Sequence, residues 1–363
     1  MKKILTIVGA RPQFIKVASV SRVLRKYFQE ILVHTGQHYD HNMSGVFFDE
    51  LNIPQPDYNL TVGSGGHGTQ TGMMMQKIEE IVLQEKPDGI LVYGDTNSTL
   101  AGALVASKLH IPLVHIEAGL RSFNKQMPEE VNRILTDHIS TILFAPTIQS
   151  VRNLEKENIT ENVHLVGDVM NDAVLYNMRI AEKKFTLQQF GLEDRTYMLV
   201  TIHRAENTDN AARLEAIFRS LNEVKRQIIL PLHPRTKQKL EQFGLLYLLE
   251  DSHHIKVIKP VSYLEMLYLE KHANAIVTDS GGVQKEAYFA KKPCYTLREQ
   301  TEWVETVESG WNILVDPKED SLSTIMNGAR PSEYDEELYG NGKASERIVQ
   351  EMLRYFKENK KCV

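Results

Sequence analysis

The stretch VTDSGGVQKE (277–286) contains residue types that indicate ligand chemistry. An apolar, strand-like run ends just before Ser280, and Gly281 and Gly282 then precede a helical stretch. Glycines let a backbone approach a ligand closely, and the start of a helix presents free N–H groups with a partial positive charge. The turn therefore predicts a phosphate site, with Glu286 placed to accept hydrogen bonds from ribose hydroxyls. The alternative is an ordinary tight turn after a strand.

A second basic turn follows the first apolar run, in GARPQFIK (9–16). Arg11 stands before Pro12, which suits the first helical position, and Lys16 lies about one turn further on. Two cations beside a helix start predict a clamp for a diphosphate; the alternative is a solvated basic turn without a ligand. The first turn, GARPQ, has a single glycine rather than G-x-G-x-x-G, and G-x-x-x-x-G-K-S/T occurs nowhere in the sequence, so neither NAD nor a P-loop is expected, and no cofactor is predicted.

Two carboxylates that follow strand-like runs are candidates for proton transfer. Asp95 in YGDTNST and Glu117 in HIEAGLRS should lie at the edge of a cleft, where burial and nearby cations shift the pKa of a carboxylate. Asp95 could instead cap the alanine-rich helix that follows it. Glu117 could instead be an exposed loop residue paired with Arg121.

The stretch MPEEVNR offers a third carboxylate, either Glu129 or Glu130. Glu129 and Arg133 are four residues apart and would share one face of a helix. The pair is either part of the site or a surface ion pair.

Two histidine–arginine clusters end strand-like runs in the second half of the chain. His203 and Arg204 lie in TIHRAEN, and His233 and Arg235 lie in PLHPRT. A lone histidine is more often a packing residue, but two such clusters aimed at one cleft indicate ligand binding. The histidines do not form H-E-x-x-H or another metal-ligand spacing, so no metal is expected.

Strand-like runs alternate with helical patterns along the whole chain, which predicts an α/β fold with parallel sheets covered on both faces. The rhythm restarts after a helical connector near 170–190, so we expect two doubly wound domains, 1–168 and 169–343. A last helix pattern, 344–361, has an apolar stripe and is expected to complete the first domain. Ligands of such sheets bind beyond the carboxyl ends of strands, where His38 and Arg298 also lie.

Length and composition exclude several classes of protein. A chain of 363 residues exceeds what one core usually supports, and its 42% apolar content includes no run long enough to span a membrane. The net charge of −5 gives no general attraction for nucleic acid or anionic lipid. Two cysteines and an opening apolar run too short for a signal peptide favour a cytoplasmic setting.

Together these motifs resemble the non-hydrolysing UDP-N-acetylglucosamine 2-epimerase family over essentially the whole chain. The matching stretches are GARPQFIK, GDTNSTLAGA, HIEAGLRS, PEEVNRILTD, LFAPT, HRAEN and TDSGGVQKEA. The resemblance implies an isomerase with a GT-B-like fold, in which two Rossmann-like domains enclose the active site in a cleft. It also implies a homodimer and a final helix that returns to the first domain.

The resemblance assigns roles to residues of both halves. Asp95, Glu117 and Glu129 would be the acid/base carboxylates, and His203 would contact the diphosphate near the reacting centre. The residues expected to bind the UDP-sugar are Arg11, Lys16, Arg133, His203, Arg204, Ser280, Gly281, Gly282, Glu286 and Arg298. The reaction would expel UDP from C1 while C2 loses its proton, and the glycal and UDP would then recombine on the opposite face.

Other functions are compatible with these motifs. A GT-B glycosyltransferase would pass the sugar to an acceptor, and a sensor would bind the nucleotide sugar without reaction. The segments SFNKQMPEE and REQTEWVET are similar to the branch that acts on UDP-2,3-diacetamido-glucuronic acid. Members activated by a second UDP-N-acetylglucosamine carry Gln-His-Arg and Arg-Gln-Thr stretches, where this chain has QHYDHNM (37–43) and GHGTQTG (66–72), which argues against such activation.

Overall fold

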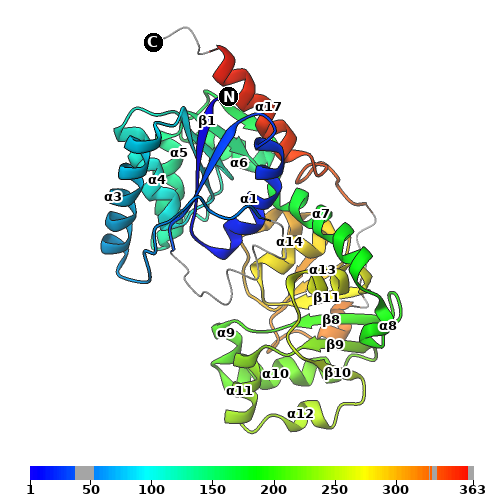
Figure 1. Cartoon of the computed structure of the whole chain (residues 1–363). Coiled ribbons are helices and arrows are strands. Elements are labelled where there is room, and N and C mark those ends of the chain that lie inside the picture. The colour runs from blue at the N-terminus through cyan, green and yellow to red at the C-terminus, as the bar shows by residue number, and fades with distance from the viewer. Residues whose placement is uncertain (37–52, 327, 329–332, 359–363) are drawn as a thin grey trace. The chain divides into compact units, whose positions relative to one another are not determined.

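The chain folds into two compact units of α/β structure (Figure 1). The computed structural model describes residues 1–36, 53–326, 328 and 333–358. One unit comprises Met1–Ala173 with Glu336–Val363, and the other comprises Val174–Asp335. The predicted α/β class with two Rossmann-like sheets is confirmed. His38 and the segment 37–43 lie outside the described residues.

The limits of the two units differ from the predicted domains. The first unit continues to Ala173 rather than ending at residue 168, and its second segment begins at Glu336 rather than at residue 344. The extra residues are tied to the first unit by hydrogen bonds: Asp168 N–H donates to Tyr339 O at 2.9 Å, and Asn171 Nδ2 donates to Gly340 O at 2.7 Å. Helical periodicity alone could not locate these contacts between distant segments.

The first unit is built on a parallel sheet that has seven strands in the described residues, in the order β3-β2-β1-β4-β5-β6-β7. Its inner strands are short runs of buried, mostly β-branched residues, which is typical of a sheet covered on both faces. The strands are β1 (Lys3–Val8), β2 (Gln29–His34), β3 (Tyr58–Asn59), β4 (Gly89–Tyr93), β5 (Leu113–Ile116), β6 (Ile142–Ala145) and β7 (Val163–Leu165).

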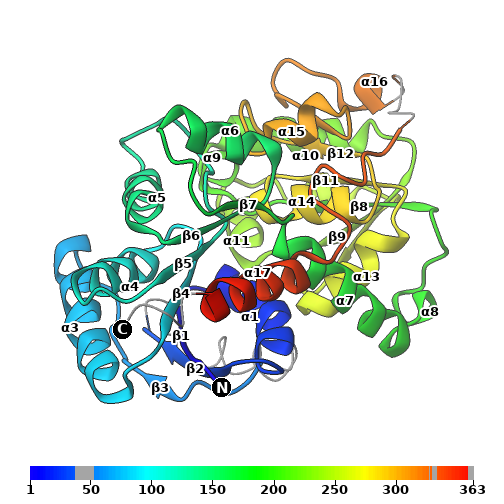
Figure 2. The same cartoon turned by 90° about the horizontal axis from the view of Figure 1, so that it is seen from above.

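Helices pack on both faces of this sheet, and α17 lies beside α1 in both cartoon views (Figures 1 and 2). The helices are α1 (Arg11–Leu24), α3 (His67–Glu85), α4 (Asn97–Lys108), α5 (Pro128–Ile139), α6 (Ile148–Lys156), α7 (Val169–Lys184), which continues into the second unit, and α17 (Ala344–Glu358). The predicted apolar stripe of α17 is buried. Phe356 reaches the start of β4, where a Cβ on Gly89 would lie 2.6 Å from its ring.

The second unit repeats the plan with strands in the order β10-β9-β8-β11-β12-β13, all of them parallel. This is the doubly wound order, in which the sheet reverses direction between its first and fourth strands. The strands are β8 (Tyr197–Thr201), β9 (Gln227–Pro231), β10 (Ile255–Ile258), β11 (Ala275–Thr278), β12 (Cys294–Thr296) and β13 (Asn312–Leu314).

The helices of the second unit begin with side-chain caps in several places. Ser262 starts one helix by accepting a hydrogen bond from Glu265 N–H at 3.3 Å, and the Glu265 carboxylate accepts from Ser262 N–H at 2.7 Å. The helices are α8 (Leu187–Phe190), α9 (Ala205–Thr208), α10 (Ala211–Asn222), α11 (Pro234–Gln242), α12 (Tyr247–Glu250), α13 (Tyr263–His272), α14 (Gly281–Phe289), α15 (Val304–Glu308) and α16 (Leu322–Met326).

Two carboxyl groups meet in the core between α13 and α14. Glu270 is fully buried and Glu286 is 6% exposed. Burial, and then the charge of Glu286 and the hydrogen bond with it, raise the pKa of Glu270 well above its ordinary value. The neutral, protonated form of Glu270 is therefore favoured in this buried position.

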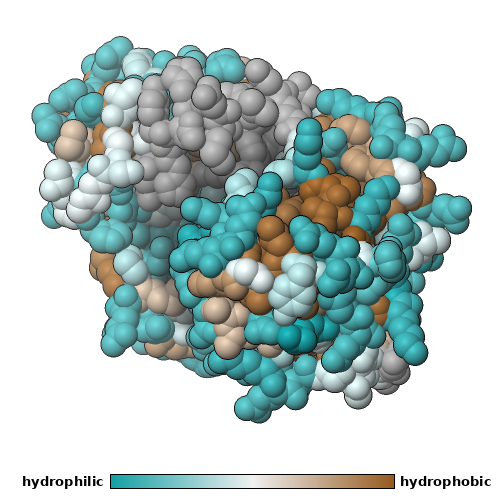
Figure 3. All heavy atoms as spheres, turned by 90° about the horizontal axis from the view of Figure 1, so that it is seen from below, coloured by the Kyte–Doolittle hydropathy of each residue, from teal (hydrophilic) through white to brown (hydrophobic). Residues whose placement is uncertain are grey.

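No helix in the described part of the chain is long and apolar enough to cross a membrane. On the face drawn in Figure 3, hydrophilic residues predominate around a smaller apolar area.

We expect Glu270→Gln to raise the free energy of unfolding by about 1–3 kcal/mol at pH 8, because the amide stays neutral in this buried position, where alkaline pH removes the proton of the carboxyl group. The pKa of Glu270 is raised in the folded state. Its contribution is therefore complete below the ordinary glutamate value of 4.5 and is lost as the pH rises. Urea unfolding at pH 5 and pH 8 measures the free energy of unfolding of both proteins. The excess stability of Glu270→Gln over the wild type should be smaller at pH 5 than at pH 8.

The matched control is Glu250→Gln on α12, because the Glu250 side chain is exposed. This substitution should change the free energy of unfolding only slightly, and by the same amount at both pH values. Equal stability of the wild type and Glu270→Gln at pH 8 would contradict the interpretation that Glu270 is neutral in the folded protein.

Candidate active site

The candidate site of the first unit lies at the carboxyl ends of β1, β4 and β5, where the sheet order reverses. Gln13 holds the turn after β1. Its Oε1 accepts from Gly9 N–H at 2.8 Å and Ala10 N–H at 3.0 Å, and its Nε2 donates to Tyr93 O at 2.8 Å. Gly9 is sterically required, because a Cβ there would lie 2.1 Å from Thr35 Oγ1. The side chain of Arg11 is outside the described part of the structure.

Lys16 and Glu117 form an ion pair at the centre of this edge. Glu117 is 4% exposed and has a left-handed backbone with φ of +70°, a conformation that L-residues rarely adopt. Burial lowers the pKa of Lys16, but Glu117, followed by Asp95 and Asp168, raises it above its ordinary value. The alternative that Glu117 is an exposed partner of Arg121 is wrong.

Gly94 leaves room for this pair. A Cβ at that position would lie 3.1 Å from Glu117 Oε2 and 3.7 Å from Lys16 Nζ, and Gly94 itself has φ of +62°. Any larger residue would be strained and would press on the carboxylate. The backbone is thus shaped around the Lys16–Glu117 pair.

Asp137 fixes the loop that carries Glu117. Its carboxylate accepts from His115 Nδ1 at 2.7 Å, from Gly119 N–H at 3.0 Å and from Arg121 Nη1 at 2.7 Å. Arg121 also binds Glu157, with Nε donating at 2.7 Å. The pKa of Asp137 is lowered, since His115 and Arg121 outweigh the opposing effect of burial. This network surrounds the loop on both sides of Glu117.

Asp95 is held by Arg133 of α5, whose Nη2 lies 2.8 Å from the Asp95 carboxylate. Arg133 Nη1 also donates to Glu130 at 2.6 Å. Thr96, rather than Asp95, caps α4 by accepting from Thr99 N–H at 3.3 Å. The capping alternative for Asp95 is therefore wrong, and its carboxylate faces a guanidinium.

Glu129 and Glu130 have different surroundings. Glu130 is 1% exposed and accepts from Ser122 N–H at 2.9 Å and Phe123 N–H at 2.8 Å, so it anchors the loop before α5. Glu129 is exposed on the first turn of α5. Arg133 pairs with Glu130 and Asp95, so the surface ion pair with Glu129 is not formed.

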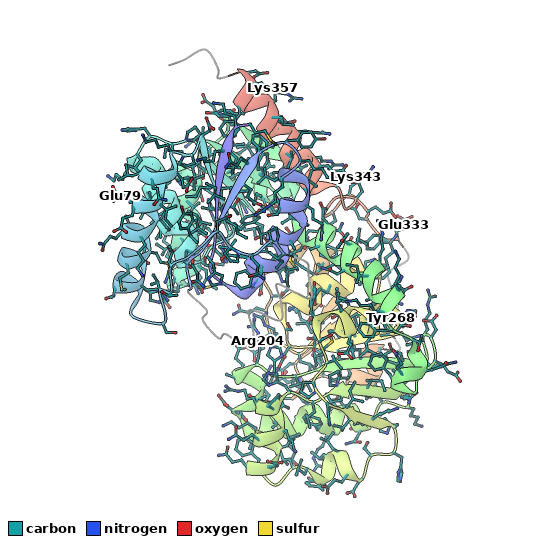
Figure 4. All side chains as sticks on the ribbon, in the orientation of Figure 1. Glu79, Arg204, Tyr268, Glu333, Lys343 and Lys357 are labelled. Atoms are coloured by element: carbon teal, nitrogen blue, oxygen red, sulfur yellow. The ribbon has the colours of Figure 1, made fainter. Side chains whose placement is uncertain are left out.

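In the second unit, buried Asp279 organises the carboxyl ends of β8 and β11. Its carboxylate accepts from His203 N–H at 3.0 Å, from Arg204 N–H at 2.9 Å and from Asn207 Nδ2 at 3.1 Å. The half-exposed His203 ring has Nδ1 3.4 Å from Asp279. Arg204 is labelled in Figure 4 near the carboxyl end of β8.

The predicted phosphate turn forms the start of α14. Ser280 is the N-cap and its side chain makes no capping hydrogen bond, which leaves the hydroxyl for a ligand. Gly281 lies close to Glu302, because a Cβ there would lie 2.5 Å from Glu302 Oε1. A Cβ on Gly282 would meet only Ser280 Oγ, at 3.9 Å. Glu302 thus brings a carboxylate to the helix start.

Cations converge on the same turn. Arg298 Nη1 donates to Glu302 at 3.0 Å, and a Cβ on Gly281 would lie 3.6 Å from Arg204 Nη2. Two predicted phosphate-binding arginines are therefore gathered at the helix start. Glu286 lies on the second turn of α14, where it is buried against Glu270.

His233 and Arg235 belong to a separate contact. His233 caps α11 by accepting from Arg235 N–H at 3.2 Å, and its ring lies 5.4 Å from that of His203. Burial, and then the charge of His203, lower the pKa of His233. Arg235 pairs with Asp209 at 2.6 Å. Within the described residues, no group of three His, Cys, Asp or Glu side chains is placed to hold a metal.

Sequence patterns missed the residues that position the site. Asp137 and Asp279 are buried carboxylates whose partners are backbone N–H groups and distant side chains. No local sequence pattern therefore indicates their role. A partial signal existed for Asp279, because it immediately precedes Ser280. Glu302 had no signal of its own.

The chain is similar over nearly its whole length to known epimerases. A model of the family described as UDP-N-acetylglucosamine 2-epimerase matches residues 22–353. A UDP-N-acetylglucosamine 2-epimerase homolog from Methanococcus maripaludis is 56% identical over 355 residues, which cover 97% of this chain and 99% of that protein. The UDP-2,3-diacetamido-2,3-dideoxy-D-glucuronate 2-epimerase of Pseudomonas aeruginosa is 50% identical and covers 97% of this chain and 99% of its own length.

A solved structure supports the same relationship. The UDP-GlcNAc 2-epimerase of Methanocaldococcus jannaschii, in complex with UDP-GlcNAc and UDP, superposes with a TM-score of 0.81. It is 49% identical and covers 98% of this chain and 100% of that one. From the family match and these full-length similarities, the chain belongs to the UDP-N-acetylglucosamine 2-epimerase family, a family of isomerases.

Proposed function

We propose that this protein interconverts UDP-N-acetylglucosamine and UDP-N-acetylmannosamine by eliminating UDP and adding it back. The single observation that carries the proposal is the Lys16–Glu117 ion pair at the carboxyl edge of the first sheet. Asp95 lies close enough for its charge to help raise the pKa of Lys16. Two carboxylates at one strand edge meet the requirement for proton transfer at C2. Membership of the family supplies the substrate class.

The proposed reaction begins with removal of the C2 proton by a carboxylate. The electron pair of the C2–H bond becomes the C1–C2 double bond of a glycal, and the C1–O electrons leave with UDP. Return of UDP to C1 and of a proton to the opposite face of C2 completes the inversion. Asp95, Glu117 and Glu129 are the candidate acid/base groups, and of these Glu129 is the exposed one.

The second unit would hold the leaving group. The free start of α14, with Ser280, Gly281 and Gly282, suits the diphosphate, and the backbone N–H groups there need partners that a phosphate provides. Arg204, Arg298 and His203 would stabilise the charge that develops on UDP. Arg11 and Glu286 are proposed for the phosphate and the ribose, respectively.

Solvent deuterium tests this function. The protein is incubated with UDP-N-acetylglucosamine in deuterated water, and the recovered nucleotide sugars are examined by NMR. Deuterium at C2 of both epimers is expected. Acceptor-dependent release of UDP would indicate a glycosyltransferase, free sugar with UDP would indicate hydrolysis, and binding without reaction would indicate a sensor.

A second candidate substrate is UDP-2,3-diacetamido-glucuronic acid. The Pseudomonas aeruginosa enzyme named for that sugar is 50% identical to this chain over nearly all of both proteins. Parallel assays of kcat/KM on the two sugars separate the candidates, because binding groups at C3 and C6 should favour one substrate over the other.

Carboxylate variants test the assignment of the acid/base groups. We expect Asp95→Asn and Glu117→Gln each to lower kcat by about 10²- to 10⁴-fold, because a positioned proton-transfer group is worth about that much. The dissociation constant of UDP should change by less than about threefold. Glu161→Gln is the control, because Glu161 is exposed in the loop before β7, and it should leave kcat unchanged. If Asp95→Asn or Glu117→Gln kept the wild-type kcat, the replaced carboxylate would have no part in the mechanism.

Removing the carboxylate at the start of α14 should strengthen UDP binding. We expect Glu302→Gln to lower the dissociation constant of UDP by about two- to fivefold, since a partly exposed charge near a phosphate contributes about 0.2–1 kcal/mol. Calorimetric titration measures it. Glu299→Gln is the control, because Glu299 is 72% exposed and pairs with Arg213 instead. Weaker binding by Glu302→Gln would instead make Glu302 a ligand-holding residue.

We also propose a cytoplasmic homodimer. Met127, Val131 and Leu135 recur every four residues from the N-cap of α5 and are each at least 38% exposed, which leaves an apolar stripe on one side of the helix. A second copy of the chain is the partner that family resemblance predicts.

Light scattering after size-exclusion chromatography tests the dimer. Val131→Glu should convert it to a monomer, because a buried unpaired carboxylate opposes association. Ile148→Glu on α6, where Ile148 is 57% exposed, is the control and should leave the dimer intact. A monomeric wild type at micromolar concentration would contradict the proposal.

A further inference from the structure

A cationic pocket lies in the second unit at the amino ends of its strands, the edge of the sheet opposite to the phosphate turn. The residues around it immediately precede β8, β11, β12 and β13. Its volume is about 400 Å³, which is within the range of about 300–1,000 Å³ found for small-molecule sites. The lining consists of Arg195, Lys271, Ala273, Asn274, Ala290, Lys291, Lys292, Pro293 and Trp311. Four of these residues are cations and none is acidic.

Two acidic residues beside this pocket, Glu182 and Asp194, are shared between His272 and two of the pocket's cations. His272 joins Asp194 and Glu182, with one ring nitrogen 2.7 Å from each carboxylate. Glu182 also pairs with Lys271 at 3.0 Å, and Asp194 lies 3.9 Å from Arg195. These contacts offset part of the charge of Lys271 and Arg195, and they leave the Lys292 side of the pocket positive.

Of the four cations that line the pocket, Lys292 is the one whose ammonium has no interaction partner among the described residues. It is 7% exposed, and although its backbone N–H donates to Ala287 O at 2.9 Å, its side-chain ammonium forms no hydrogen bond or ion pair within the described part of the chain. Burial, and then the charge of Arg195, lower the pKa of this ammonium, with Asp194 opposing them and Lys271 adding to them. A buried ammonium is costly unless it is neutralised or paired. An anion in the pocket would supply the missing partner.

The walls define the class of ligand. Trp311 is fixed by its Nε1, which donates to Glu333 O at 2.9 Å, and it packs edge-on against Tyr334 with centroids 5.5 Å apart. Lys291 lies over the Tyr334 ring at 4.5 Å. Together with two alanines and a proline, the Trp311 side of the pocket is apolar, opposite the cations.

We propose that this pocket binds a small phosphorylated metabolite, with the phosphate on Lys292 and Arg195 and the carbon skeleton against Trp311. The ligand is held apart from the nucleotide turn. In Figure 4, Arg204 and Tyr268 lie on opposite sides of the second unit, and Tyr268 is on α13, the helix that also carries Lys271. Within the second unit, the site therefore lies at the opposite edge of the sheet from the start of α14.

Phenyl phosphate is a suitable probe, because it combines a phosphate with a planar apolar group. The full-length protein is first saturated with UDP, so that the nucleotide site is filled, and is then titrated with phenyl phosphate by calorimetry. One further molecule should bind per chain. Lys292→Met should weaken binding by about tenfold or more, and Arg195→Ala by about threefold, because Arg195 is 72% exposed and its charge is better screened.

Lys237→Met is the matched control, because Lys237 is a 61% exposed lysine on α11. It should bind phenyl phosphate as the wild type does. Since Lys292→Met removes only a buried charge and keeps most of the side-chain volume, its melting temperature without ligand should not fall. The exposed Arg195→Ala variant provides an independent test if it does. The proposal would be overturned if phenyl phosphate did not bind to the UDP-saturated wild type. It would also be overturned if Lys292→Met and Arg195→Ala both bound phenyl phosphate as tightly as the wild type does.

Discussion

The buried ion pair between Lys16 and Glu117 is the interaction on which the proposed chemistry depends. A carboxylate that is 4% exposed needs a cation or donors around it, and Lys16 supplies the cation from the second turn of α1. The surrounding backbone is adapted to the pair: Glu117 has a left-handed φ, and Gly94 leaves the space that a side chain would fill. The reversal of strand order brings these segments, about a hundred residues apart, to one edge of the sheet.

Both units use the same device to position their functional side chains. A buried aspartate accepts hydrogen bonds from the backbone of the loop that carries them: Asp137 holds the loop of Glu117, and Asp279 holds the loop of His203 and Arg204. Each aspartate is held by several hydrogen bonds, so the functional side chains keep their positions before substrate arrives. In the second unit the free start of α14 faces Glu302, a carboxylate that a diphosphate would displace.

Local patterns in the sequence predicted strand ends, the phosphate turn and the candidate carboxylates, because alternation of strands and helices places those residues at one edge of a sheet. They did not predict partners. Lys16 pairs with Glu117, Arg133 binds Glu130 and Asp95 rather than Glu129, and Arg121 binds Asp137. Each of these contacts is set by tertiary packing, which spacing along one helix cannot reveal. The unit limits were displaced for the same reason.

Positional isotope exchange tests reversible cleavage of the C1–O bond most directly. UDP-N-acetylglucosamine carrying ¹⁸O in the bridge between C1 and the β-phosphate is incubated with the protein, and ³¹P NMR follows the label in recovered substrate. If UDP departs and returns, the label should move from the bridge to non-bridging oxygens of the β-phosphate while the epimer forms. Formation of the epimer with all of the label still in the bridge would contradict elimination and re-addition.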